Sequence, residues 1–362
     1  MENKIHVSEA RRGTRAYRGQ LRVGPVTCQS PSAVESFSPS VPLAILGQPK
    51  PQQARFYVAA TPDGQAQPNG ITKEAAGYQS GKGLRGRKVY PHHTNLPLHY
   101  WDSPTQDRTQ QADDGTHFQE YRRSHRPEME TYTDDHGKQR QRPRMNADGT
   151  FKLLQGEGNE QRDDQNRSIF GWVKPGTVFT FDLDVFNLSD VELGALLWLL
   201  SLSPEHYHRL GGGKPLGFGS VRLEIAGLDL RNGAAWRAFY KSFETAPAPA
   251  FDQKAAIAQF QQAVADAYGD PAQAAGEPQS RFQRVPFIAA FLRAAEGFRD
   301  ALPIHYPRAR QPNQQGAVPP HPEGKAFEWF VANERQPGDA IGLPDLVDDH
   351  GLPCLTTGKE KH

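Results

Sequence analysis

A glycine-rich stretch with one lysine is the strongest chemical signal in this sequence. It runs from Leu210 to Ile225 and reads LGGGKPLGFGSVRLEI. Its glycines and its cation are Gly211, Gly212, Gly213, Lys214, Gly217 and Gly219. Glycine is favoured where the backbone φ angle must be positive or where another backbone must come close. Bare backbone N–H groups beside a lysine suit a phosphate backbone, so the stretch predicts a phosphate-binding loop.

A second stretch, residues 78–93, combines cations with glycine and aromatic rings. It reads YQSGKGLRGRKVYPHH and contains Lys82, Arg85, Arg87, Lys88, Tyr90, His92 and His93. This mixture is typical of a groove for single-stranded RNA, where cations follow the phosphates and rings stack on bases. The alternative is a solvated basic turn with Tyr90 in the core. Adjacent histidines point in different directions and no cysteine or carboxylate cluster lies nearby in sequence, so we predict no metal site.

A strand, a helix and a second strand must position the glycine-rich stretch. Residues 177–186 alternate apolar and polar side chains, which predicts a half-buried strand. The helix begins after Ser189, which forms a capping-box pattern with Glu192, and Pro204 ends it. This helix is apolar nearly all round and is therefore expected to be buried. Val221–Ile225 alternates again, and this order is the closing half of a ferredoxin-like βαββαβ unit in an α+β fold.

Composition limits the class and location of the protein. The 362 residues suffice for two domains or one elaborated domain, and 34 glycines with 30 prolines predict much loop. A net charge of +1 excludes a global field for nucleic acid, so such a site is a local patch. Two distant cysteines and a polar N-terminal sequence indicate a reducing compartment and no signal peptide. The longest apolar run, residues 193–200, is too short to span a bilayer, so we expect a cytoplasmic protein without a membrane partner.

Common catalytic motifs do not occur in the sequence. The Walker A pattern fails because Pro215 follows Lys214 and His208 stands where its first glycine belongs. The dinucleotide-binding G-x-G-x-x-G pattern lacks its last glycine. Asp182 and Asp184 share one face of a strand and could bind a metal, but an exposed polar face explains them more simply.

Four stretches together resemble a known family. ELGALLWLLSL followed by LGGGKPLGFGSVRLEI resembles the C-terminal glycine-rich loop of the repeat-associated mysterious protein (RAMP) superfamily, the RNA-binding subunits of CRISPR effector complexes. The stretches Leu43–Tyr57, Gly83–His93 and Ala326–Glu334 are similar to the type III branch. The resemblance implies a ferredoxin-like (RRM-like) RAMP core with a long insertion and a C-terminal helical extension.

The resemblance also implies a function. The chain would be a backbone-like subunit of a type III effector complex in antiviral defence, with guide RNA, target RNA and other RAMP subunits as partners and no cofactor. Its RNA-binding residues would be Lys82, Arg85, Arg87, Lys88, His92, His93, Gly211, Gly212, Gly213, Lys214, Gly217, Phe218 and Gly219. The protein would hold the guide backbone by shape and charge while the guide reads the sequence.

Four parts follow from the same resemblance. They are an N-terminal part of the core at 1–93, a thumb-like or flexible insertion at 94–165, a C-terminal part of the core at 166–232, and a helical extension with a proline-rich tail at 233–362. We expect strands at 20–27, 41–46 and 54–60, and helices at 234–243, 251–268 and 285–302. Alternating arginines in the insertion would lie over a guide–target duplex or simply form a solvated loop.

Whether the chain cleaves RNA is a separate question. Some type III RAMP subunits cleave target RNA with an aspartate in the loop after the first strand. The matching stretch, Gly24–Ala44, contains Glu35 and no aspartate, which favours a non-catalytic scaffold. The alternative is a target-RNA endonuclease that uses a divalent metal and an acidic residue of the insertion, namely Asp102, Asp107, Asp113 or Asp114. A third hypothesis is a glycine-rich interaction protein without an RNA role.

Overall fold

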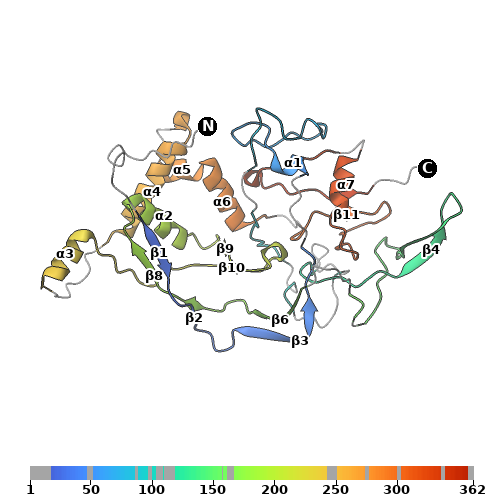
Figure 1. Cartoon of the computed structure of the whole chain (residues 1–362), viewed down its shortest axis with the longest axis horizontal. Coiled ribbons are helices and arrows are strands. Elements are labelled where there is room, and N and C mark those ends of the chain that lie inside the picture. Colours follow the sequence, from blue (N-terminus) through green and yellow to red (C-terminus); the bar gives the residue numbers. More distant parts are fainter. Residues whose placement is uncertain are drawn as a thin grey trace. The chain divides into compact units, whose positions relative to one another are not determined.

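The computed structural model describes residues 18–46, 52–85, 89–96, 100–102, 109, 119–156, 158–160, 167–242, 251–273, 277–299, 303–335 and 339–357. Helices and small sheets both occur among them, so the fold is α+β, as predicted (Figure 1). The chain divides into two compact units, each built from three separate segments. Unit 1 comprises 1–34, 173–202 and 223–288, and unit 2 comprises 35–172, 203–222 and 289–362. The four-part division expected from the sequence stays a prediction.

Unit 1 contains two short antiparallel strand pairs. Strand β1 (Gln20–Val23) pairs with β8 (Leu183–Phe186), and β2 (Thr27–Cys28) pairs with β7 (Phe179–Thr180). The strands predicted at 20–27 and 177–186 are therefore each interrupted once. Pro25 lies in the first interruption, and because proline has no N–H it cannot donate to a strand ladder.

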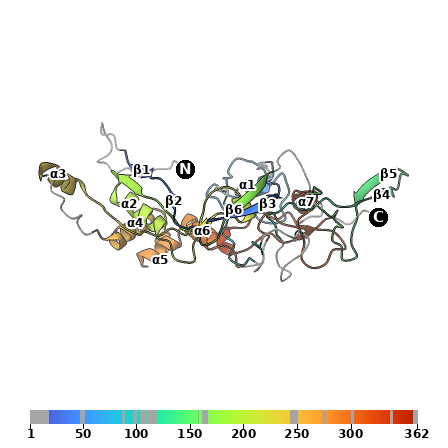
Figure 2. The same cartoon turned by 90° about the horizontal axis from the view of Figure 1, so that it is seen from below.

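Helix α2 (Asp190–Leu200) packs against helix α4 (Gln253–Tyr268) in the same unit (Figure 1 and Figure 2). The predicted capping box is confirmed, since the Glu192 N–H donates to the Ser189 hydroxyl and the Ser189 N–H donates to the Glu192 carboxylate. Gly194 and Leu197 of α2 are fully buried and most of its other residues are half-buried, so the helix is less buried than expected. A Cβ on Gly194 would lie 2.1 Å from the Ala256 carbonyl oxygen, so this glycine lets the two helices approach closely.

The remaining helical elements of unit 1 are α3 (Gly233–Ser242), α5 (Pro278–Gln283) and the first turn of α6 (Pro286–Glu296), with a 3₁₀ turn η3 (Pro271–Gln273). Of these, α3 and α6 match predicted helices, whereas α5 and η3 were not predicted. Helix α6 ends before Gly297, whose φ of +88° terminates it earlier than predicted. Among the described helices, none combines the length and the apolar character that crossing a bilayer requires.

Unit 2 consists of short elements joined by long loops. Its strands are most of β3 (Val34–Pro42) and β6 (Ser168–Val173), the hairpin β4 (Met129–Thr133) and β5 (Gln139–Pro143), the hairpin β9 (His208–Arg209) and β10 (Ser220–Val221), and the parallel pair β11 (Ala309–Arg310) and β12 (Leu355–Thr356). Its helical elements are α1 (Ala54–Tyr57), α7 (Glu328–Glu334), η2 (Lys214–Leu216), η4 (Leu346–Asp348) and the rest of α6.

An aromatic cluster forms the core of unit 2. Its buried members are Phe37, Val41, Tyr100, Tyr121, Leu216 and Ile304, with Trp101, Trp172 and Phe218 packed against them. The rings meet edge-on or stacked, as Trp101 and Tyr121 do at 5.3 Å between centroids. Tyr100, Trp101 and Tyr121 come from the stretch expected as an insertion, so that stretch supplies part of this core.

Three strand predictions fail in extent or type. In the segment expected as a strand at 54–60, residues 54–57 form helix α1, where Glu334 holds Arg55 and Phe56 packs on Trp329 and Phe330, and Val58 makes an isolated β-bridge with Leu84. The strand expected at 41–46 is instead the end of β3, which stops at Pro42. The strand expected at 221–225, after the glycine-rich stretch, is reduced to the two residues of β10. Every sheet in the described part of the chain has two strands, so the four-stranded ferredoxin-like sheet remains an expectation.

Candidate nucleic-acid interface

The glycine-rich stretch forms a hairpin loop between β9 and β10. The Leu210 N–H donates to the Gly219 carbonyl at 2.8 Å and closes the loop. Inside it, the 3₁₀ turn η2 is bounded by Gly213 and Gly217, whose φ angles are +71° and +92°. Left-handed backbone on both sides of the turn explains why these two positions are glycine.

Two apolar side chains anchor this loop in the aromatic core. Leu216 is 1% exposed and belongs to the same cluster as Tyr121 and Ile304. The Phe218 ring lies 5.0 Å from the Trp101 ring, between centroids. The predicted RNA-binding residue Phe218 is therefore half-buried and already has aromatic partners within the chain.

The tip of the loop is open, in contrast to its base. A Cβ on Gly219 would lie 1.9 Å from the Leu210 carbonyl oxygen, so glycine is required there by the fold. A Cβ on Gly211 or Gly212 would meet no atom within 4 Å, and both residues are exposed. The φ angle of Gly212 is not positive, so nothing in the described structure explains its lack of a side chain.

Arg209 holds the loop from within. Its Nη2 donates to the Lys214 carbonyl at 2.8 Å, and its Nη1 donates to the Gly217 carbonyl and to the Ser220 hydroxyl. Burial lowers the Arg209 pKa to about 10, so the guanidinium is charged at neutral pH. Within the described ranges, neither Arg209 nor the Lys214 ammonium has an acidic partner. The loop therefore carries positive charge that the chain does not neutralise there.

His92 lies at the base of this loop. Its Nδ1 is 2.7 Å from the Ser220 hydroxyl, and its ring stacks on Tyr207 at 4.3 Å between centroids. Burial, with a smaller contribution from the Arg209 charge, lowers the His92 pKa to about 4. A neutral imidazole at pH 7 is thus a packing and hydrogen-bonding group. His93 makes a parallel backbone bridge with Phe298.

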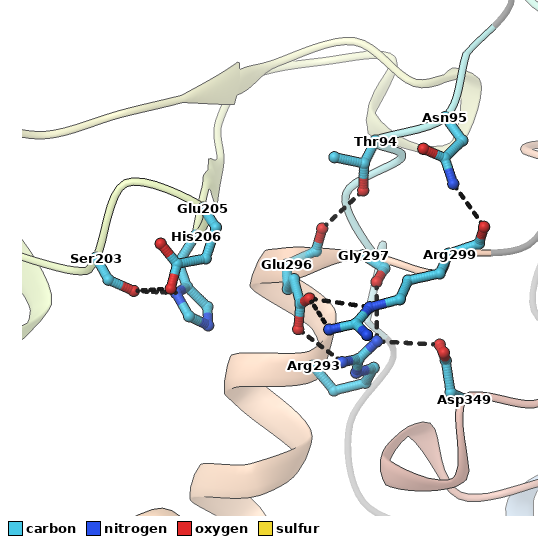
Figure 3. A network of polar contacts seen from close by, with 10 residues as sticks. All are labelled: Thr94, Asn95, Ser203, Glu205, His206, Arg293, Glu296, Gly297, Arg299 and Asp349. Carbon is cyan, nitrogen blue, oxygen red and sulfur yellow. Dashed lines mark hydrogen bonds and ion pairs between the residues drawn. The ribbon is translucent and has the colours of Figure 1, made fainter.

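A network of polar contacts fixes the segment that follows the histidines (Figure 3). The Thr94 hydroxyl donates to the Glu296 carbonyl at 3.0 Å, and the Asn95 amide donates to the Arg299 carbonyl. The Glu296 carboxylate contacts Arg293 at 2.6 Å and Arg299 at 2.7 Å, and Arg293 also contacts Asp349 at 3.1 Å. The end of α6 thereby holds the 92–95 segment beside the loop.

The other predicted cations lie away from the loop or outside the described residues. The Lys82 ammonium donates to the Ala75 carbonyl. Arg85 contacts Asp345 at 2.8 Å, and only 9% of its side chain is exposed. Arg87 and Lys88 lie outside the described residues. Of the basic stretch, the structure thus brings His92 to the glycine loop, while Lys82 and Arg85 bind other parts of the chain.

Sequence reasoning missed the side chains that support the loop. Arg209 is its internal clamp, and Tyr207 carries both the His92 ring and the Arg222 guanidinium, which lies 5.3 Å from the Tyr207 centroid. Ser220 joins Arg209 to His92. The signal was present in the sequence as Tyr207 and Arg209, four and two positions before the first glycine, because Arg209 ends β9 and Tyr207 directly precedes that strand.

The arginines of the predicted thumb are engaged by acids on the β4–β5 hairpin. The pairs are Arg140–Asp134 at 2.5 Å, Arg142–Glu130 at 2.7 Å and Arg144–Glu128 at 3.5 Å. Local acids thus neutralise these cations, and exposed pairs of this kind contribute little stability.

A serine, a histidine and a glutamate gather in Figure 3 without forming a hydrolytic triad. The Ser203 hydroxyl contacts both the Glu205 carboxylate and the His206 Nδ1 within one turn. In a triad the histidine lies between serine and acid, which is not the case here. No group of three metal-binding side chains occurs in the described ranges, which include Asp102, Asp182 and Asp184. Asp107, Asp113 and Asp114 fall outside these ranges.

Comparison of the sequence with protein-family models and with curated proteins finds no match.

Proposed function

We propose that this chain is an RNA-binding subunit of a type III-like CRISPR effector complex, built on a ferredoxin-like RAMP core. It holds guide RNA and the guide–target duplex in the cytoplasm, beside other RAMP subunits. The order of four sequence stretches that resemble the family supports this proposal. So does the antiparallel pairing of β1 with β8, because a βαββαβ unit pairs its first and third strands in this way.

One observation carries the proposal. The exposed Gly211–Gly212 tip leaves open space and bare backbone in a loop that contains Lys214 and is held by Arg209. Open backbone N–H groups and unneutralised cations are the two features that bind a phosphate chain without reading bases. A structural turn would need neither the bare tip at Gly212 nor the excess charge.

The contacts of Glu35 favour a scaffold over a nuclease. Glu35 is the acidic residue in the stretch where a cleaving relative would carry aspartate. One of its carboxylate oxygens accepts a hydrogen bond from the Trp172 indole N–H at 3.0 Å, so it positions an aromatic ring of the core. We therefore propose RNA retention without cleavage, and a divalent metal would be needed only for cleavage.

The test uses two matched glycines. Gly212→Val fills the open loop tip, and Gly227→Val adds the same side chain at another exposed glycine with no neighbour within 4 Å and no positive φ. We expect Gly212→Val to weaken binding of a labelled single-stranded RNA about 10- to 100-fold, the worth of one or two charge-assisted contacts. Gly227→Val should leave affinity unchanged.

Fluorescence anisotropy at several salt concentrations measures this difference, because phosphate contacts make affinity fall with salt. Circular dichroism checks that both variants remain folded. Equal affinity of Gly212→Val and Gly227→Val would refute an RNA-binding role of the loop. Absence of salt-dependent binding by the unaltered protein would refute the proposed function itself.

A further inference from the structure

Helix α3 carries aromatic rings that the fold leaves in solvent. None of its ten residues is buried. Trp236 is 44% exposed and Tyr240 is 64% exposed, and their rings stack one turn apart with centroids 6.0 Å from each other. We call this pair, with the adjacent Phe239, the α3 aromatic face. Aromatic side chains normally bury large areas, so an exposed stack of this kind marks an interaction surface.

A local contact fixes the start of this helix. The Asn232 side chain accepts a hydrogen bond from the Ala235 N–H at 2.9 Å and caps the first turn. A ten-residue helix without a buried face is marginally stable in isolation. Burial of its aromatic face by a ligand would add the stabilisation that the chain does not supply.

The charge of α3 identifies the class of ligand. Arg231, which precedes the helix and pairs with Asp229 at 3.6 Å, has its guanidinium 5.3 Å from the Trp236 centroid and 5.9 Å from that of Phe239. Arg237 and Lys241 have no ion pair within the described ranges, and the helix contains no acidic residue. Flat rings interleaved with unpaired cations suit the bases and phosphates of a single strand.

The composition of α3 argues against the other occupants. Its aliphatic residues are alanines, whereas a helix that lies on a membrane presents a wide band of large apolar side chains. A helix that docks in a protein groove uses large apolar anchors at i, i+3, i+4 and i+7. Trp236, Phe239 and Tyr240 occupy the first three of these positions, but Arg237 and Lys241 lie between and beside them, and these cations favour a polyanion over an apolar groove.

We propose that the α3 aromatic face is a second RNA contact, where unpaired bases stack on Trp236 and Tyr240 and their phosphates approach Arg237 and Lys241. This inference rests on the proposed function for the presence of RNA. It adds a site that recognises single-stranded RNA by stacking, whereas the glycine loop recognises the phosphate backbone.

Tryptophan fluorescence tests this directly. All five tryptophans lie in the described residues. Trp236 is exposed, whereas Trp101, Trp172 and Trp198 are half-buried and Trp329 is fully buried. Titration with an adenine-rich single-stranded RNA should quench the emission of the unaltered protein, and Trp236→Phe should remove that quenching. Inorganic polyphosphate, which has charge without bases, should not quench. Trp236→Ala with Tyr240→Ala should weaken RNA binding about 5- to 100-fold, the worth of base stacking.

Each contrary result has one meaning. Quenching that persists in Trp236→Phe, or that polyphosphate reproduces, would overturn the stacking site. A blue shift with phosphatidylglycerol vesicles and no response to RNA would overturn it in favour of a membrane surface. If RNA binds in a Gly212-dependent manner but Trp236 does not respond, this inference fails and the proposed function stands. If the unaltered protein binds no RNA at all, both fail.

Discussion

Substitution at Gly219 separates the structural glycines of the loop from its open tip. Gly219 has a φ of +80°, and a Cβ there would lie 1.9 Å from the Leu210 carbonyl oxygen. In Gly219→Ala, the left-handed backbone costs about 1–2 kcal/mol. Opening the loop also breaks the Leu210–Gly219 hydrogen bond, which is worth about 1 kcal/mol. The sum is about 2–4 kcal/mol once some displacement of Leu216 from the core is included.

This loss should lower the melting temperature by about 5–15 °C, since each kcal/mol shifts a domain of this size by a few degrees. Gly212→Ala should leave the melting temperature within about 2 °C, because its Cβ meets no atom and the substitution reduces only the freedom of the unfolded chain. Differential scanning calorimetry with near-ultraviolet circular dichroism measures both. Equal melting temperatures for the two variants would refute the distinction between Gly219, which the fold requires, and Gly212, which the fold does not require.

Three further results are expected. Arg55→Met should cost about 3–5 kcal/mol in urea unfolding, because Arg55 is 1% exposed at its side chain and its loss leaves Glu334 without its partner. The pKa of His92 is about 4 in the folded protein and 6.5 ordinarily, so the stability that neutral His92 contributes is present above pH 6.5 and is lost as the pH falls toward 4. His92→Gln should therefore flatten the curve of unfolding free energy against pH between these values, and an unchanged slope would contradict this. Both cysteines are exposed, but partial desolvation raises the pKa of the Cys354 thiol, so Cys28 should react faster with a disulfide reagent at pH 7.5, as two single Cys→Ser variants would show; equal rates would contradict the raised pKa of Cys354.

Local signals in the sequence were sufficient for part of the fold. The capping box at Ser189 and Glu192 was found because all its partners lie within four residues. The helix near 253–268 was found because its periodicity is sustained over several turns. The left-handed backbone of the loop at 211–219 could be predicted because clustered glycines indicate positive φ angles.

Signals that depend on distant residues were not sufficient. The segment at 54–57 has the composition of a strand, but its helix is fixed by Glu334 and aromatic residues of α7 far along the chain. Arg85 looks like an RNA-contacting cation in sequence, whereas Asp345 binds it in the structure. The packing of Phe218 on Trp101 was hidden for the same reason. Sequence spacing shows which charges exist and not which partner each one finds.

The order of segments in the two units has a consequence for how the protein is made. Unit 1 needs residues near both 20 and 268, and unit 2 needs residues near both 37 and 355. Neither core can close during synthesis until most of the chain has left the ribosome, so folding is dominated by pairings between distant segments and should be slow. A break in the chain at any single position would divide at least one unit, so neither unit can be produced alone as one uninterrupted segment.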